Sequence, residues 1–245
     1  LVGSEMCIRD RPNIGAIHSF SFHNYVTLFT TPELIDMIIG SIALAIGSAV
    51  LATILGTTGA IGAFYSKKNV NGTMSVLNQI PVVNADVVTG FSLCILLVVV
   101  FGVSKNTYIP LVIGHTVLSA PFVYLAVVPK LKQMDPSLYE AALDLGATPG
   151  YTLIHIIIPQ IASGIISGFV MAVTLSLDDY FVATYTKPAT FDTISTYVVN
   201  ATKGSQTNIR TALWALSTII FLIVVIVEVV MNFAPIKNEA QKEKH

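Results

Sequence analysis

Long apolar runs alternate with short polar stretches along most of the chain. The runs cover about residues 35–65, 81–103, 109–128, 161–184 and 211–233. A run of roughly 18–25 apolar residues is long enough to cross a bilayer as a helix. Backbone amides cannot stay unpaired in hydrocarbon, and five segments do not fit an even-stranded barrel. The pattern therefore predicts an all-α, polytopic transmembrane domain over residues 12–235.

Composition agrees with this pattern and excludes a soluble globule. The chain of 245 residues is 53% hydrophobic and only 11% charged, with a mean hydropathy of +0.74. Soluble domains carry about 25% charged residues, so too few charges are present to cover a water-exposed surface. The net charge of −1 gives no indication of a nucleic-acid partner. The two cysteines, Cys7 and Cys94, are far apart, and no metal-binding spacing is present.

The two ends of the chain differ from the apolar middle. Residues 1–11, LVGSEMCIRDR, contain no apolar signal core and look like translated adapter sequence, so we interpret them as non-native and exclude them from the fold. Residues 236–245 form a charged tail. An intact version would have a further span before residue 12, which would make this a six-span protein with its first span missing.

Basic residues predict the orientation, because cytoplasmic loops carry an excess of Lys and Arg. Alternate numbering of the sides gives seven lysines on one side. The other side has four basic residues, with Arg9 and Arg11 left out. We therefore expect the loop at residues 129–160 and the C-terminus to be cytoplasmic. The seven lysines are Lys67, Lys68, Lys130, Lys132, Lys237, Lys242 and Lys244, and the other four residues are Lys105, Lys187, Lys203 and Arg210.

The polar loop at residues 129–160 has its own helical pattern. Asp135 and Pro136 form a favourable helix start, and strong helix formers follow up to Gly146, a typical C-terminal stop. This predicts a short helix over residues 136–145. A second helical piece begins after Thr148, and we expect Pro159 to bend it into the next span.

The predicted short helix has an apolar stripe and a separate acidic face. Glu140 and Asp144 lie four residues apart on the acidic face. A helix lying on anionic lipid would instead have Lys and Arg on its polar face, so the charges favour a protein partner over a membrane surface. The stripe consists of Leu138, Ala141, Ala142 and Leu145.

The same loop carries a spaced motif. After Glu-Ala-Ala come three residues, Gly, nine residues, Ile, one residue, and a dipeptide that ends in Pro. This pattern resembles the signature loop of the permease subunits of ABC importers, and it departs from it only at Ile158, where that family usually has Leu. The matching residues are Glu140, Ala141, Ala142, Gly146, Ile156 and Pro159.

Residues 115–188 extend the resemblance to the permeases of the spermidine/putrescine type, in particular their C-type subunit, with the Ser-Leu-Asp-Asp stretch as the most specific part. The resemblance implies that the loop couples this chain to a separate ATPase. It also implies a bacterial cytoplasmic membrane location and three partners: a second homologous permease, an ABC ATPase dimer and an extracytoplasmic solute-binding protein. ATP and Mg²⁺ would be used by the ATPase, and this chain itself would bind no cofactor.

Acidic residues near the ends of spans are the candidate pathway residues. Asp178 and Asp179 end the run GFVMAVTLSLDD, Tyr180 follows them, and Asp86 lies near the start of another span. Carboxylates in a membrane segment are costly and usually face a cavity or a partner, and Tyr can bind a cation through its ring. Adjacent residues of a helix diverge by about 100°, so we expect one of the two adjacent acids to face the pathway.

Other interpretations of these residues stay open on sequence grounds. The two adjacent acids would also fit a solvated helix end, or they could pair with a lysine of a partner permease. Asp86 would also fit the first turn of a helix, where an acid is favourable. Tyr180 would also fit a belt of aromatic residues at the membrane interface. His115 and His155 are isolated, and the sequence predicts no chemistry for them.

No P-loop and no hydrolase motif occurs, so we expect a permease subunit without enzymatic activity. An ABC permease for another small organic solute is the main alternative. An intramembrane enzyme built on Asp178 and Asp179 is disfavoured, because adjacent acids diverge on a helix. A secondary carrier would predict inverted repeats, and it would leave the loop motif unexplained.

Overall fold

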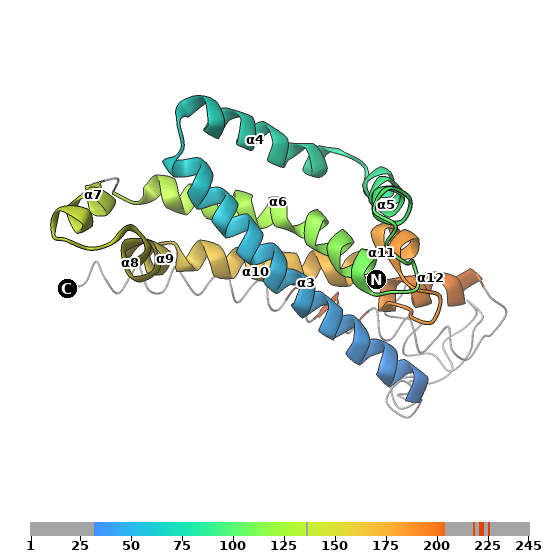
Figure 1. Ribbon diagram of the computed structural model, residues 1–245. Helices are drawn as coiled ribbons and strands as arrows, with labels where there is room; N and C mark the ends of the chain where they lie inside the picture. Colours follow the sequence, from blue (N-terminus) through green and yellow to red (C-terminus); the bar gives the residue numbers. More distant parts are fainter. Residues whose placement is uncertain (1–31, 136, 204–217, 219–220, 223–224, 226–245) are drawn as a thin grey trace.

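The computed structural model describes residues 32–135, 137–203, 218, 221, 222 and 225, and this described part is helical with no strand. Three long helices form its centre: α3 (Pro32–Tyr65), α6 (Ile109–Gln133) and α10 (Ala162–Asp178) (Figure 1). The predicted all-α fold is confirmed. The predicted span 211–233 lies almost entirely outside the described residues, as do residues 1–31 and the tail.

Two of the described helices are long and apolar enough to cross a bilayer. These are Leu34–Tyr65 within α3, and α6. The exposed side of α3 carries a series of large apolar side chains, which suits contact with lipid. This series consists of Ile39, Ile42, Ile46, Val50, Leu51, Ile54 and Leu55.

The three central helices approach closely because small residues line their contacts. A Cβ atom added at Gly56 of α3 would lie 2.7 Å from Val123 Cβ of α6, and one at Gly168 of α10 would lie 3.1 Å from Val123 Cα. Close approach of this kind is typical of small residues at helix interfaces in membranes. Gly47, by contrast, has open space around its Cα, so spacing alone does not identify the packing face.

The predicted second span over residues 81–103 does not coincide with a single helix of the structure. A helix α4 (Lys68–Val83) begins well before it and contains Pro81 near its end. The chain then breaks at Asn84 and Ala85, and α5 (Asp86–Ile95) with the π-helical turn η1 (Leu96–Val100) continues at 105° to α4. Residues 81–100 therefore belong to a bent pair of helices that is long and apolar enough to cross a bilayer only when the two helices are taken together.

Polar residues lower the hydropathy of α4, so the hydropathy pattern did not predict this helix. In the structure these residues form hydrogen bonds with α6. Asn78 Nδ2 donates to the carbonyl oxygen of Pro121 in α6 at 3.2 Å, and Ser75 Oγ lies 3.3 Å from Tyr124 Oη. Interhelical hydrogen bonds of this kind make polar side chains acceptable at membrane depth. A low local hydropathy therefore did not exclude a membrane helix.

The predicted fourth span over residues 161–184 is also interrupted. Helix α10 ends at Asp178, and Asp179 has an extended backbone with φ −67° and ψ 123°. The chain then turns into the short helix α11 (Phe181–Thr186), and α12 (Ile194–Lys203) follows. The turn is stabilised by the Asp179 carboxylate, which accepts hydrogen bonds from backbone N–H groups of α11.

The loop between α6 and α10 is helical, as predicted. It consists of α7 (Ser137–Asp144), then α8 (Pro149–Thr152), the π-helical turn η2 (Leu153–Ile157) and α9 (Ile158–Gln160). The piece from Pro149 to Gln160 meets α10 at a bend of 72°. Pro159 lacks the N–H that an unbroken helix would use, so a bend next to it is expected.

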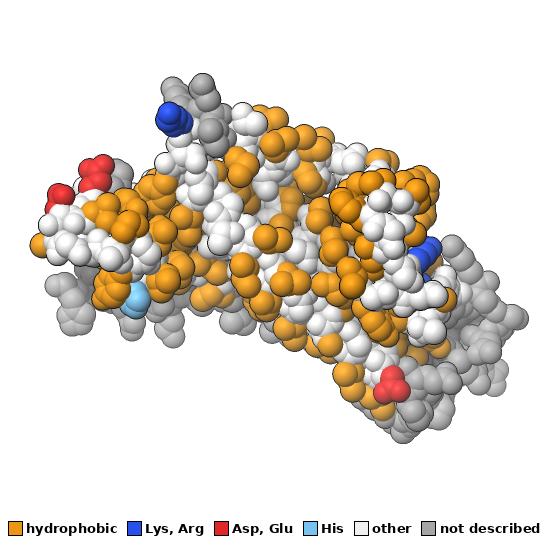
Figure 2. Space-filling view, in the orientation of Figure 1, with side chains coloured by type: hydrophobic (Ala, Val, Ile, Leu, Met, Phe, Trp, Pro, Cys, Tyr) orange, Lys and Arg blue, Asp and Glu red, His pale blue; other side chains and the backbone are white. Residues whose placement is uncertain are grey.

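These elements gather at opposite ends of the molecule. Helices α7, α8 and α9 lie at one end of the central helices, and α5, α11 and α12 lie at the other (Figure 1). Figure 2 shows apolar side chains across the middle of the visible face, with described acidic and basic side chains towards its ends. This distribution matches a protein whose middle lies in hydrocarbon.

Candidate functional site

The end that carries α7 is built from two local capping arrangements. At its start, Asp135 Oδ1 accepts hydrogen bonds from the backbone N of Ser137 at 2.9 Å and from Ser137 Oγ at 2.8 Å. These bonds hold the pKa of the Asp135 carboxyl below its ordinary value. A depressed pKa means that the cap stabilises the fold above the ordinary pKa, and that this contribution is lost as pH falls through the depressed value.

The end of α7 is fixed by Gly146. Its φ of +86° lies in the left-handed region, which glycine adopts without the strain that a Cβ would cause. The backbone N of Gly146 donates to the Leu143 carbonyl at 2.9 Å, and that of Ala147 donates to the Ala142 carbonyl at 3.0 Å. This pair of bonds is a Schellman motif, so the predicted helix stop at Gly146 is confirmed.

The six residues of the loop motif divide into exposed and internal groups. Ala142 is buried, and Ile156 packs against the central core. The other four are exposed: Glu140, Ala141, Gly146 and Pro159. Because Ala142 faces inward, the predicted stripe of Leu138, Ala141, Ala142 and Leu145 is not a single outward face.

An exposed apolar surface nevertheless lies beside the motif. Leu145 is 89% exposed at the end of α7, and Ile154 is 60% exposed on η2. Tyr151 stacks on the ring of His155 with centroids 4.2 Å apart, and both are exposed. Exposed apolar and aromatic side chains next to Glu140 suit a docking surface for another protein.

At the opposite end, α11 packs against both α5 and α6. A Cβ atom at Gly90 of α5 would lie 2.9 Å from Val182 Cα, and one at Gly114 of α6 would lie 2.8 Å from Val182 Cγ1. Two glycines thus make room for Val182, and this packing joins α5, α6 and α11. Asp86 lies one helical turn before Gly90, on the face of α5 that meets α11.

The structure brings together the acids that the sequence singled out, but it gives them different surroundings. Asp178 and Asp86 are exposed, and their negative charges act on the Asp179 carboxyl through space. Asp179 is only 8% exposed and accepts hydrogen bonds from Val182 N at 3.2 Å and Ala183 N at 2.7 Å. Of the two adjacent acids, Asp178 is thus exposed and Asp179 is buried, and whether either faces a pathway stays a prediction. Tyr180 is half-buried, with its ring 5.2 Å from that of Phe181.

The sequence interpretation missed three buried polar residues next to these acids. His115 Nε2 lies 3.6 Å from Asp179 Oδ2, and His115 Nδ1 lies 2.8 Å from Ser176 Oγ. Ser48 Oγ lies 3.2 Å from the same Ser176 hydroxyl. The three residues come from α6, α10 and α3, and an imidazole within an apolar run was the only sequence signal for them.

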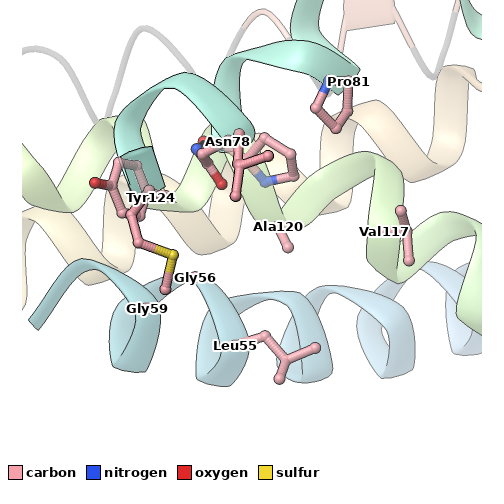
Figure 3. A pocket seen from close by; sticks show the side chains of 11 residues that line it. Leu55, Gly56, Gly59, Asn78, Pro81, Val117, Ala120 and Tyr124 are labelled. Carbon is pink, nitrogen blue, oxygen red and sulfur yellow. Dashed lines mark hydrogen bonds between the residues drawn. The ribbon is translucent and has the colours of Figure 1, made fainter. Parts of the chain in front are cut away.

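A separate pocket of about 310 Å³ opens between α3, α4 and α6 (Figure 3). Its lining is mainly apolar, and none of the residues that line it is charged. It therefore lacks the carboxylates that a cation would require. The pocket is lined by Leu55, Gly56, Gly59, Met74, Leu77, Asn78, Pro81, Val117, Ala120, Pro121 and Tyr124.

The described helices thus place the loop motif at one end of the domain and the acids at the other. Residues 57–234 match the family described as "Binding-protein-dependent transport system inner membrane component". This chain belongs to that family of permease subunits of ABC importers, and the resemblance seen in the loop motif is confirmed.

Several curated relatives have similar sequences. The spermidine/putrescine transport system permease protein PotC of Haemophilus influenzae is 30% identical over 89% of this chain and 83% of its own length. PotC of Escherichia coli K12 is 28% identical over 82% of this chain and 76% of its own. The putrescine transport system permease protein PotI of Escherichia coli K12 is 34% identical over 59% of this chain and 53% of its own.

Solved structures with lower identity share the fold. A chain of a bacterial ABC transporter that imports alginate superimposes with a TM-score of 0.68 at 19% identity, covering 94% of this chain and 87% of that one. A chain of the MetNI methionine ABC transporter superimposes with a TM-score of 0.58 at 13% identity, covering 84% of this chain and 95% of that one. The predicted fold of ABC importer permeases is thereby confirmed.

Proposed function

We propose that this permease subunit moves a polyamine, spermidine or putrescine, across the bacterial cytoplasmic membrane. The observation that carries the proposal is the group of acids formed by Asp86, Asp178 and Asp179 at one end of the membrane domain. The relatives named above as spermidine/putrescine and putrescine permeases support the same class of solute.

The exposed acids fit the chemistry of a polyamine. A polyamine carries separated ammonium groups joined by short apolar chains, so it needs carboxylates that are accessible and set apart from each other. Asp86 on α5 and Asp178 on α10 are both exposed and come from different helices. Tyr180, half-buried beside them, offers a ring face to an ammonium group. In this proposal Asp179 acts indirectly, because its carboxylate is buried and already bonded to α11.

We further propose that the loop at residues 129–160 docks on a separate ABC ATPase in the cytoplasm, which binds ATP and Mg²⁺. Exposed Glu140, Ala141 and Gly146, with the neighbouring apolar side chain of Leu145, would form the contact. Lys67, Lys130 and Lys132 lie near the same end, which supports a cytoplasmic orientation by the excess of basic residues.

The working transporter would be a complex of several proteins. It would contain a second homologous permease, an ATPase dimer and an extracytoplasmic solute-binding protein. The family description names dependence on a binding protein, and a related alginate transporter was solved in complex with a periplasmic protein that holds alginate pentasaccharide. The acidic end, remote from the coupling loop, would receive the solute from the binding protein.

The direct test is uptake of radiolabelled spermidine into right-side-out membrane vesicles or proteoliposomes that contain this permease and its three partner components. Putrescine and glycine betaine serve as comparators, with and without ATP on the ATPase side. We expect ATP-dependent transport of spermidine or putrescine and none of glycine betaine. ATP-dependent transport of glycine betaine alone would replace the proposed solute but keep the coupling, and transport without ATP or partners would refute the coupling.

A substitution in the loop tests the coupling separately. We expect Glu140→Lys to weaken recovery of the ATPase in a pull-down by about tenfold, because a reversed charge at an interface acts against a complementary surface. The spans should stay folded, since Glu140 is exposed. Asp36→Lys, which reverses the charge of an exposed acid on α3 outside the loop, is the matched control. Normal ATPase recovery with Glu140→Lys would contradict the proposed contact.

A further inference from the structure

Four buried polar side chains form a continuous chain inside the membrane domain. Ser48 Oγ of α3 lies 3.2 Å from Ser176 Oγ of α10, which lies 2.8 Å from His115 Nδ1 of α6. His115 Nε2 lies 3.6 Å from Asp179 Oδ2, at the joint between α10 and α11. The side chains of His115 and Asp179 are 0% and 3% exposed. One polar chain thus connects three central helices to the acidic end.

The Asp179 carboxylate is the element of this chain that fixes the joint. On one side it accepts the backbone N–H groups of Val182 and Ala183, which hold the start of α11. On the other side it faces the imidazole of His115, which belongs to α6. Asp178 precedes it directly and is exposed. The backbone joint that carries Asp178 and Tyr180 on either side of Asp179 is therefore tied to the position of the Asp179 carboxylate.

The His115 contact is not explained by packing alone. Its Nε2 atom has no hydrogen-bond partner among the described residues, and the 3.6 Å between Nε2 and the Asp179 carboxylate is longer than a hydrogen bond. An apolar side chain would fill this buried position without the cost of an unsatisfied polar atom. Ionisable residues inside membrane segments mark functional sites far more often than they serve as filling.

We propose that His115 is a positioning residue for solute recognition: by facing the Asp179 carboxylate it fixes the joint between α10 and α11, and so aims the exposed carboxylate of Asp178 at the solute. This inference rests on the proposed function, in which Asp178 contacts the solute. His115 itself touches no solute in this arrangement. Ser176 and Ser48 hold the imidazole from its other side.

Two substitutions separate positioning from simple packing. In His115→Gln, the terminal amide reaches the position of Nε2 and keeps a polar group facing Asp179. In His115→Asn, the shorter amide reaches only the position of Nδ1, beside Ser176. Both variants remove the ring, and both keep one polar contact within the buried chain. They differ mainly in which neighbour they keep.

The first experiment measures KM and Vmax for spermidine uptake per assembled complex, with assembly quantified by pull-down of the ATPase. We expect His115→Asn to raise KM about five- to tenfold, the effect of losing one modest contact, with Vmax changed less than about twofold. We expect His115→Gln to restore most of the KM. Equal KM in wild type and both variants, or loss of assembly in both, would assign His115 a structural role and overturn the proposal.

A second readout does not depend on which solute is transported. A cysteine is introduced at Asp178 in a background where Cys7 and Cys94 are replaced by Ser, and its reaction rate with a water-soluble maleimide is measured. Positioning predicts a changed rate when His115→Asn is added and recovery with His115→Gln. Unchanged rates would refute the inference even if spermidine is transported. A changed rate without spermidine transport would keep the positioning role and refute only the proposed solute.

Discussion

The backbone of Gly146 determines where the helix of the coupling loop ends. Its φ of +86° is unfavourable for any residue with a Cβ, and nothing lies within 4 Å of the position that a Cβ would occupy. A substitution here is therefore strained by its backbone alone and not by a steric clash. Within this chain, the effect of such a substitution falls on the end of α7.

We expect Gly146→Ala to destabilise the end of α7 by about 1 kcal/mol, because alanine is strained in the left-handed region. ATPase recovery in a pull-down should fall about fivefold if the loop must keep this shape to dock. Gly150→Ala is the matched control, since Gly150 lies in α8 with open space around it and alanine favours a helix. A similar loss in both variants would contradict the role of the left-handed turn.

Asp178 provides the sharpest test of the acidic end at the scale of one residue. We expect Asp178→Asn to lower spermidine uptake at subsaturating concentration about tenfold, because a hydrogen bond to a charged group contributes roughly 1.5–3 kcal/mol. Complex assembly should not change, since the side chain is exposed. Asp36→Asn removes an exposed acid from α3 and should leave uptake near the wild-type level. Unaffected uptake in Asp178→Asn would remove this residue from the pathway.

At the scale of elements, helix packing depends on which small residues face a neighbour. Gly56 and Ala60 lie on the face of α3 that meets α6, where Ala60 is fully buried. Ala43 and Gly47 have the same four-residue spacing, but both are exposed. Spacing of small residues in the sequence therefore predicted the existence of close packing but not its position.

We expect Gly56→Ala to destabilise the membrane domain by about 1–3 kcal/mol, because the added methyl overlaps Val123 and the Ala120 carbonyl, which are 2.7 and 2.8 Å from the Cβ position. Gly47→Ala should have almost no effect, since nothing lies within 4 Å. The measurement is the thermal stability of the detergent-purified protein. Equal midpoints for the two variants would contradict the packing described for α3 and α6.

The elements that the sequence predicted well are those with a strong local signal. Continuous apolar runs identified α3 and α6, and capping residues identified α7 and its end at Gly146. Helix α4 was missed because Ser75 and Asn78 reduce its hydropathy, and the partners that satisfy them lie on α6, more than forty residues away. Non-local partners of this kind leave no trace in a hydropathy pattern.

The candidate site was predictable to a similar extent. The loop motif and the acids at Asp178 and Asp179 were visible as sequence patterns, but their burial was not. Asp179 is buried because α11 turns back onto it, and His115 meets it from a helix more than sixty residues earlier. Only the folded structure shows that Asp178 is the exposed acid and that Asp179 is the acid that fixes the start of α11.

At the scale of the whole molecule, the coupling loop and the acidic end lie at opposite ends of the central helices (Figure 1). This arrangement predicts that the two ends are reached from opposite sides of the membrane. With Cys7 and Cys94 replaced by Ser, we expect Ala141→Cys to react with an impermeant maleimide only in inside-out vesicles. Asn106→Cys, exposed in the link between η1 and α6, should react only in right-side-out vesicles. Labelling of both from the same side would contradict the proposed orientation.

Helix α10 begins at the 72° bend beside the coupling segment and ends at Asp178. Its 17 residues make it a stiff rod about 25 Å long. A change in the angle between α10 and the segment Pro149–Gln160 therefore moves the far tip of α10. A tilt of about 10° about the bend would displace the far tip by about 4 Å, which is comparable to the diameter of an ammonium group with its contacts. Such a tilt would displace Asp178 relative to Asp86 on α5, and it would change the contact between Ser176 of α10 and His115 of α6.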